Sequence, residues 1–134
     1  MIIVILAGIF IVYISRRTSN NLIEASEISG KYQEIGIFNS LTVSFELDDD
    51  GEIETDFFLV PTRTSLTVKC VEGNLSNLEI LLYDTNYPDY IQSGFIESVG
   101  DSITFTNLFG GQTYFIKVVL HDGSSDKLIL RFSK

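Results

Sequence analysis

The chain begins with an unbroken apolar stretch, MIIVILAGIFIVYI, over residues 1–14. These residues carry no charge, and the Tyr13 hydroxyl is their one strong hydrogen-bonding side-chain group. Because the stretch is apolar on every side, it predicts a helix surrounded by lipid or by other apolar helices. At about 1.5 Å per residue it reaches roughly 21 Å, which is short of the roughly 30 Å hydrocarbon layer of a bilayer.

The pattern becomes amphipathic after residue 14. Apolar residues then recur at spacings of three and four, as expected for one face of a helix, at Leu22, Ile23, Ala25, Ile28 and Tyr32. Gly30 is a suitable C-terminal stop, because glycine adopts the left-handed conformation at low cost. The sequence therefore predicts one helix from about residue 2 to about residue 29, within an N-terminal part of residues 1–30.

From residue 35 onward, apolar and polar residues alternate with period two, which is the pattern of half-buried strands. Turn residues such as Gly51, Gly73 and Gly123 separate predicted strands at 41–47, 53–59, 66–70, 78–83, 103–105, 113–120 and 128–132. Such a series favours an antiparallel β-sandwich, Ig-like or jelly-roll-like, over residues 35–134. The expected fold class is mainly β with one long N-terminal α-helix.

A helix that is apolar in front and amphipathic behind, attached to an all-β head, resembles a mature type IV pilin of the archaeal kind. Accessory pilin-like proteins of the archaellum, the archaeal motility filament, have a similar plan. The resemblance implies that a basic leader is removed and that the N-terminal helices pack in a filament core beneath extracellular heads. Met1 and Ile5 stand where bacterial type IV pilins usually have a Phe and a Glu, which favours the archaeal branch.

On this hypothesis the helix makes the contacts between subunits, and Gly8 allows two helices to approach closely. The expected assembly residues are Ile2, Ile5, Gly8, Ile9, Val12, Leu22 and Ile28. A plain membrane anchor and an uncleaved signal peptide stay open as other interpretations of the apolar stretch. Arg16 and Arg17 follow it, and the positive-inside tendency would place them in the cytoplasm.

The head carries a second resemblance. Segments 76–84, 111–119 and 127–132 look like the last strands of bacterial pre-peptidase C-terminal domains. Those domains are small secreted sandwiches, so the resemblance implies an extracellular β-sandwich and no particular activity.

Charge and cysteine content narrow the possible functions. The chain has 9 Lys plus Arg against 18 Asp plus Glu, a formal charge of −9 and a pI near 4.4. Binding to nucleic acid requires clustered cations and is therefore not expected. The single cysteine, Cys70, cannot form an intrachain disulfide, and its alternating surroundings predict a small buried strand residue.

Three segments invite functional interpretations. Asp48 and Asp50 partly match a calcium loop, but Phe57 stands where the bidentate Glu is expected, so a solvated turn is favoured and no cofactor is predicted. Asn74 begins a glycosylation sequon on a predicted turn. The loop 85–94 carries Tyr87 and Tyr90, which either contact a neighbour or a glycan or cap the end of the sandwich.

Catalytic signatures are missing from the sequence. It has no Gly-x-Ser-x-Gly elbow, no phosphate-binding glycine loop and a single histidine, His121, so an enzyme is not expected. We predict a structural subunit of an extracellular type IV pilus-like or archaellum-like filament, a cell-surface homo-oligomer that passes through the membrane before assembly and serves motility or adhesion. The alternative is a monomeric, membrane-anchored β-sandwich that binds a surface layer or a glycan.

Overall fold

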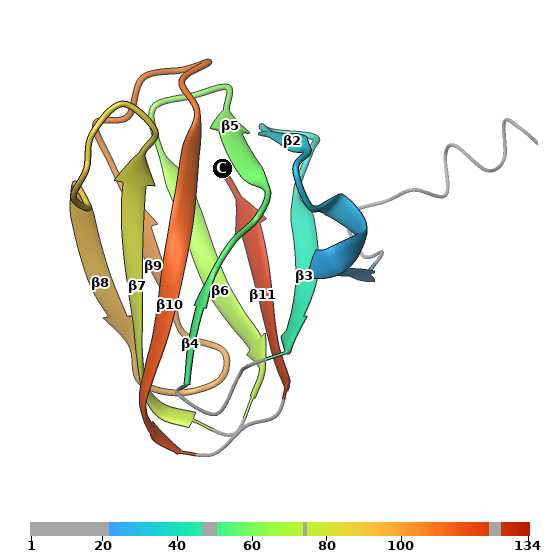
Figure 1. Ribbon diagram of the computed structural model, residues 1–134, viewed down its shortest axis with the longest axis vertical. Coiled ribbons are helices and arrows are strands. Elements are labelled where there is room, and N and C mark those ends of the chain that lie inside the picture. Colours follow the sequence, from blue (N-terminus) through green and yellow to red (C-terminus); the bar gives the residue numbers. More distant parts are fainter. Residues whose placement is uncertain (1–21, 47–50, 74, 124–126) are drawn as a thin grey trace, which may run out of the picture.

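The computed structural model describes residues 22–46, 51–73, 75–123 and 127–134, which form a sandwich of two packed β-sheets (Figure 1). The five-stranded sheet has the order β1-β3-β11-β6-β9, and the six-stranded sheet has the order β2-β5-β10-β7-β8 with β4 beside β10. The strands are β1 Leu22–Glu24, β2 Tyr32–Ile35, β3 Leu41–Glu46, β4 Glu52–Glu54, β5 Phe58–Pro61, β6 Leu66–Glu72, β7 Leu75–Asp84, β8 Gln92–Ile96, β9 Ser102–Phe105, β10 Tyr114–Gly123 and β11 Lys127–Ser133. Within these residues, no helix is long and apolar enough to cross a membrane.

Apolar and polar residues alternate along the strands, so apolar side chains of both sheets point inward and pack together as the core. Val43 and Phe45 on β3 are fully buried, and the Phe45 ring stacks on Phe57 at 6.0 Å between ring centroids. Phe57 also meets Phe132 of β11 edge-on at 6.2 Å. Burial of large side chains is the main favourable term in folding, so this aromatic cluster fixes how the two sheets face each other.

The predicted N-terminal helix is wrong where the structure describes it. Leu22–Glu24 form β1, which pairs in parallel with β3, and only Ala25–Ile28 form a single 3-10 turn, η1. The sheet edge offers β1 the backbone partners that a helix would have supplied internally, so tertiary pairing overrides the local pattern. The fold class is therefore all-β instead of β with a long helix. Residues 1–21, including Ile2, Ile5, Gly8, Ile9 and Val12, lie outside the described residues.

This difference overturns the resemblance to pilins. In the pilin plan, the rear half of one long helix lies against the head, whereas the corresponding residues here are a strand within the head. The assignment to type IV pilins, pili or the archaellum is therefore wrong. Leu22 is 47% exposed and Ile28 is 7% exposed, so the two do not share one buried helix face. The division of the chain into residues 1–30 and 35–134 stays a prediction.

Most strands of the head agree with the alternation, and one predicted strand is split. The segment 53–59 forms β4 and β5, separated by Thr55, Asp56 and Phe57. The Thr55 hydroxyl accepts from Ile116 N at 3.2 Å, beside the backbone bond from Thr55 N to Ile116 O at 3.0 Å, so it takes the place of one ladder bond at this irregularity. The sequence pattern missed β8, which falls partly in the predicted loop 85–94.

Candidate functional site

Aromatic side chains line up across the outer face of the six-stranded sheet. Alternation along β10 and β7 turns Tyr114 and Leu82 into the core, so their neighbours Phe115 and Tyr83 face outward. Phe115 and Tyr83 pair directly across the two strands. Their rings stack at 4.8 Å between centroids, with 5° between the ring planes.

A second stacked pair continues this line toward the edge of the sheet. Tyr32 of β2 pairs with Phe58 of β5, and their rings stack at 5.0 Å. Leu59 pairs with Tyr114, so the adjacent Phe58 lies on the strand beside Phe115. Tyr90, in the β7–β8 loop, meets Tyr83 edge-on at 6.4 Å. We call this set the aromatic row: Tyr32, Phe58, Phe115, Tyr83 and Tyr90.

The aromatic row is accessible, most of all at its two ends. Tyr32 is 65% exposed and Tyr90 is 51% exposed, while the other rings are half-buried against their neighbours. Because neighbouring strands lie about 4.8 Å apart, the row spans roughly 15 to 20 Å. An exposed apolar strip of this kind, with polar residues at its rim, is typical of an interaction site.

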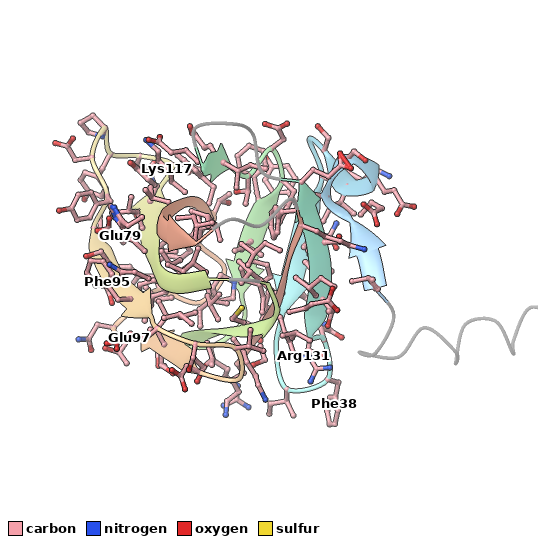
Figure 2. The ribbon with its side chains drawn as sticks, turned by 90° about the horizontal axis from the view of Figure 1, so that it is seen from below. Phe38, Glu79, Phe95, Glu97, Lys117 and Arg131 are labelled. Atoms are coloured by element: carbon pink, nitrogen blue, oxygen red, sulfur yellow. The ribbon has the colours of Figure 1, made fainter. Side chains whose placement is uncertain are left out.

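Carboxylates border the aromatic row. Lys117, two residues beyond Phe115, forms an ion pair with Glu52 at 3.0 Å, and its register partner on β4 is Glu54. The hydrogen bond with Glu52, together with the charge of Glu52, raises the pKa of Lys117. Further along the same two strands, His121 Nε2 lies 2.8 Å from Oε1 of Glu79, whose register partner is Val119. Figure 2 shows Lys117 and Glu79 on one side of the sandwich.

The opposite face has a different chemistry. On the five-stranded sheet, Arg131 of β11 pairs with Lys69 of β6, and the Arg131 Nε donates to Thr42 Oγ1 at 3.2 Å. The Thr67 and Thr104 hydroxyls lie 2.9 Å apart on the same face. This face therefore presents short hydroxyl and basic side chains, and Figure 2 places Arg131 on the side away from Glu79.

An acidic hollow opens along the side of the sandwich between β3 and β4. It consists of two adjoining spaces of about 310 and 340 Å³, which share Glu46, Ile53 and Glu54. Among the described residues, however, no group of three His, Cys, Asp or Glu side chains is placed to hold a metal ion. The calcium candidates Asp48 and Asp50 and the sequon residue Asn74 lie outside the described residues, so these stay predictions.

The two residues that could have formed a nucleophile and base lie apart. Cys70 is buried on β6 with its thiol 3.7 Å from Glu72 O, and burial raises the pKa of this thiol. This confirms Cys70 as a buried strand residue. His121 lies on the outer face of β10 in the other sheet. The histidine and the cysteine thus lie on different sheets, and the absence of catalysis stays a prediction.

The comparison with known proteins found solved structures that have low similarity to this chain. No protein-family model matches the chain, and no curated protein matches it. Among solved structures, PliG of Aeromonas hydrophila, a periplasmic inhibitor of g-type lysozyme, is 20% identical with a TM-score of 0.45, covering 77% of this chain and 96% of PliG. The pre-peptidase C-terminal domain of a Bacillus anthracis collagenase is 12% identical with a TM-score of 0.44, covering 76% and 92%. At such values the likeness carries no conclusion about function.

Proposed function

We propose that this chain is a non-catalytic binding module and that the aromatic row binds a carbohydrate chain. Sugar rings have apolar C–H faces and a polar edge of hydroxyl groups. Aromatic side chains pack against the apolar faces, and carboxylates accept hydrogen bonds from the hydroxyls. The aromatic row, with Glu34 two residues beyond Tyr32 on one side and Glu54 opposite Lys117 on the other, offers both kinds of contact on one open sheet face. This combination is the observation that carries the proposal.

The charge of the face predicts which carbohydrates are accepted. Its described outward residues include the carboxylates of Glu34, Glu52, Glu54 and Glu79 against the single lysine Lys117. A negative face repels polyanions, and the whole chain at −9 adds to that repulsion. Neutral or cationic polysaccharides are therefore the proposed ligands, and acidic polysaccharides are excluded from the site.

The site is held in place before any ligand arrives. Four rings of the row stand on paired strands and stack on one another, so their rotamers are restricted. The fifth ring, Tyr90, sits in a loop that is closed by hydrogen bonds from Ile91 N to Leu82 O at 2.8 Å and from Asn86 N to Asp84 Oδ1 at 2.9 Å. Pre-organisation lowers the entropy cost of binding. A cell-surface location, with the apolar stretch of residues 1–14 as an anchor, belongs to the same proposal.

Co-sedimentation with insoluble polysaccharides tests this function. The chain should bind chitin or its cationic derivative chitosan, and should leave cross-linked alginate, a polyanion, unbound. Tyr32→Ala and Tyr90→Ala should each weaken binding roughly tenfold, because each removes an aromatic contact worth about 1 to 3 kcal/mol.

Val71→Ala is the matched control, because Val71 is 40% exposed on the five-stranded sheet and lies outside the aromatic row. It should leave binding unchanged. Equal binding by the Tyr32→Ala variant, retention on alginate as strong as on chitosan, or no retention on any of the three materials would each contradict the proposal.

A further inference from the structure

Four loops gather at one end of the sandwich, at the top of Figure 1, and we call this the loop end. They are the β2–β3 loop (36–40), the β5–β6 loop (62–65), the β7–β8 loop (85–91) and the β9–β10 loop (106–113). Pairing of Tyr114 with both Asp84 and Leu59 brings the loops of the six-stranded sheet together. The loop end meets the aromatic row at the β7–β8 loop, which carries Tyr90, while the other four rings of the row lie on the sheet face.

The loops of this end are packed against one another. A Cβ added at Gly36 would lie 2.5 Å from Thr62 Oγ1, and one added at Gly110 would lie 3.0 Å from Thr62 O. The β5–β6 loop therefore fits closely between its two neighbours. Leu108 N donates to Thr64 O at 2.9 Å, and Phe109 N donates to the buried Tyr114 hydroxyl at 3.0 Å. These bonds fix the tips of the loops relative to the core.

Large apolar side chains project from the fixed tips. A turn closed by Gly36 N and Asn39 O places Ile37 and Phe38 at its corner, where they are 55% and 92% exposed. Phe109 is 74% exposed, and Figure 2 shows the Phe38 ring projecting clear of the ribbon. Single exposed apolar residues are common on proteins, but several held outward at one end indicate an interaction surface.

The loop end is nearly uncharged on a strongly acidic chain. Its four segments contain one cation, Arg63, and one anion, Asp89, whereas the whole chain has a formal charge of −9. The opposite end of the sandwich carries Glu72, Glu97 and Asp101 in the described loops and strand ends. The carboxylates nearest the loop end are held in hydrogen bonds, Glu34 with Asn39 at 3.0 Å and Asp84 with Gln112 at 3.1 Å.

The N-terminal segment joins the fold at this same end. Leu22, the first described residue, pairs with Thr42, and β3 begins at Leu41 directly after the β2–β3 loop. Twenty-one residues precede Leu22, and the first fourteen are apolar without a charge. A bilayer that holds this apolar stretch would lie within about 25 Å of Leu22, because only the seven residues 15–21 separate the two.

We infer that the loop end rests on a lipid bilayer, with Phe38 and Phe109 inserted at the interface and Ile37 and Tyr87 beside them. Aromatic side chains favour the boundary between headgroups and acyl chains, where an apolar ring is buried and polar groups stay wet. The single Arg63 gives little attraction to anionic lipid, so zwitterionic phosphatidylcholine is sufficient for the contact. This inference is independent of the carbohydrate site.

Tryptophan reporters test the contact, because the chain contains no Trp of its own. The full chain would be bound to phosphatidylcholine vesicles as the single variants Phe38→Trp, Phe109→Trp and Val99→Trp. Val99 is the matched control, since it is 48% exposed in the β8–β9 connection at the opposite end. The emission of the first two variants should shift to the blue and be quenched by brominated lipid, while the Val99→Trp variant stays unshifted and unquenched.

A second set of variants tests whether the rings of Phe38 and Phe109 insert into the bilayer or the loop end only lies near it. Tyr87→Trp should be quenched by brominated lipid in the native background and should fall to the level of the Val99→Trp variant when Phe38→Ala and Phe109→Ala are added. Adding Val71→Ala and Val99→Ala instead should leave the quenching unchanged. Equal quenching at both ends, no response to loss of the two phenylalanines, or no binding of the full chain to vesicles would overturn the inference.

Discussion

At the scale of single residues, two buried hydroxyl groups show how differently the same chemistry can be used. The Thr55 hydroxyl, on a residue that is 7% exposed, takes part in two hydrogen bonds with the backbone of Ile116. Ser44 is 1% exposed, and its hydroxyl has no hydrogen-bond partner among the described residues. An unmade hydrogen bond in the interior costs free energy, while a satisfied one returns only a modest gain.

Substitutions at these two hydroxyls should therefore have opposite effects. Thr55→Val keeps the shape but leaves Ile116 N without its partner, which should lower the free energy of unfolding by about 1 to 3 kcal/mol. Ser44→Ala removes an unpaired buried group and should leave stability unchanged or raise it by about 1 kcal/mol. Urea denaturation measures the free energy of unfolding of both variants. Equal losses at Thr55 and Ser44 would contradict the assigned hydrogen bonds.

At the scale of elements, the strands that alternate cleanly could be predicted, whereas the edge strands β1, β2 and β8 could not. The segments around Val43, Val68 and Leu130 show period-two alternation and form the interior of the five-stranded sheet. Strand β8 was missed because Gln92, Ser93 and Gly94 have little intrinsic preference for a strand. Gly94 is explained only by packing between the sheets, since a Cβ there would lie 3.1 Å from Ile103 Cδ1.

The prediction of the first elements, β1 and η1, failed for a different reason. Apolar residues at spacings of three and four between Leu22 and Tyr32 fit a helix, but the same residues also fit a short strand, a turn and a second strand. The deciding partners, β3 and β5, lie far along the chain, and local periodicity contains no information about them. Short apolar patterns leave this ambiguity between helix and strand in general.

Alanine substitutions at Ile28 and Leu22 distinguish the observed strand and 3-10 turn from a single helix. Ile28→Ala removes a side chain that is 7% exposed and packed in the core, so it should cost about 2 to 4 kcal/mol in the free energy of unfolding. Leu22→Ala alters a residue that is 47% exposed on β1 and should change that free energy by about 0.5 kcal/mol or less. Similar large losses at both positions, measured by chemical denaturation, would instead favour one buried helix face.

At the scale of the whole molecule, the candidate site depends on topology that the sequence does not display. The aromatic row joins residues 32, 58, 83, 90 and 115, which come from three strand pairs and one loop. Of these five residues, only Tyr90 was singled out from the sequence for a functional role, where a contact with a neighbour or glycan and a cap on the end of the sandwich were both open. The other four rings come from segments far apart in the sequence, and only the strand order and register bring them into one line.

The two proposed surfaces are compatible on one molecule. Four rings of the aromatic row lie on a sheet face, while the loop end, which includes the fifth ring Tyr90, closes one end of the sandwich (Figure 1). A module resting on a bilayer by its loop end would leave the sheet face open at the side. Carbohydrate in the surroundings could then reach the rings on the strands, such as Tyr32 and Phe58, without displacing the membrane contact.

Backbone amide chemical shifts during titration with a soluble chitin oligosaccharide test the carbohydrate site most directly. The largest shifts are predicted at Tyr32, Phe58, Tyr83 and Phe115, with amides of β6 and β9 on the other sheet unchanged. Shifts centred on β6 and β9, or no shift at millimolar oligosaccharide, would contradict the assignment of the aromatic row as the binding site.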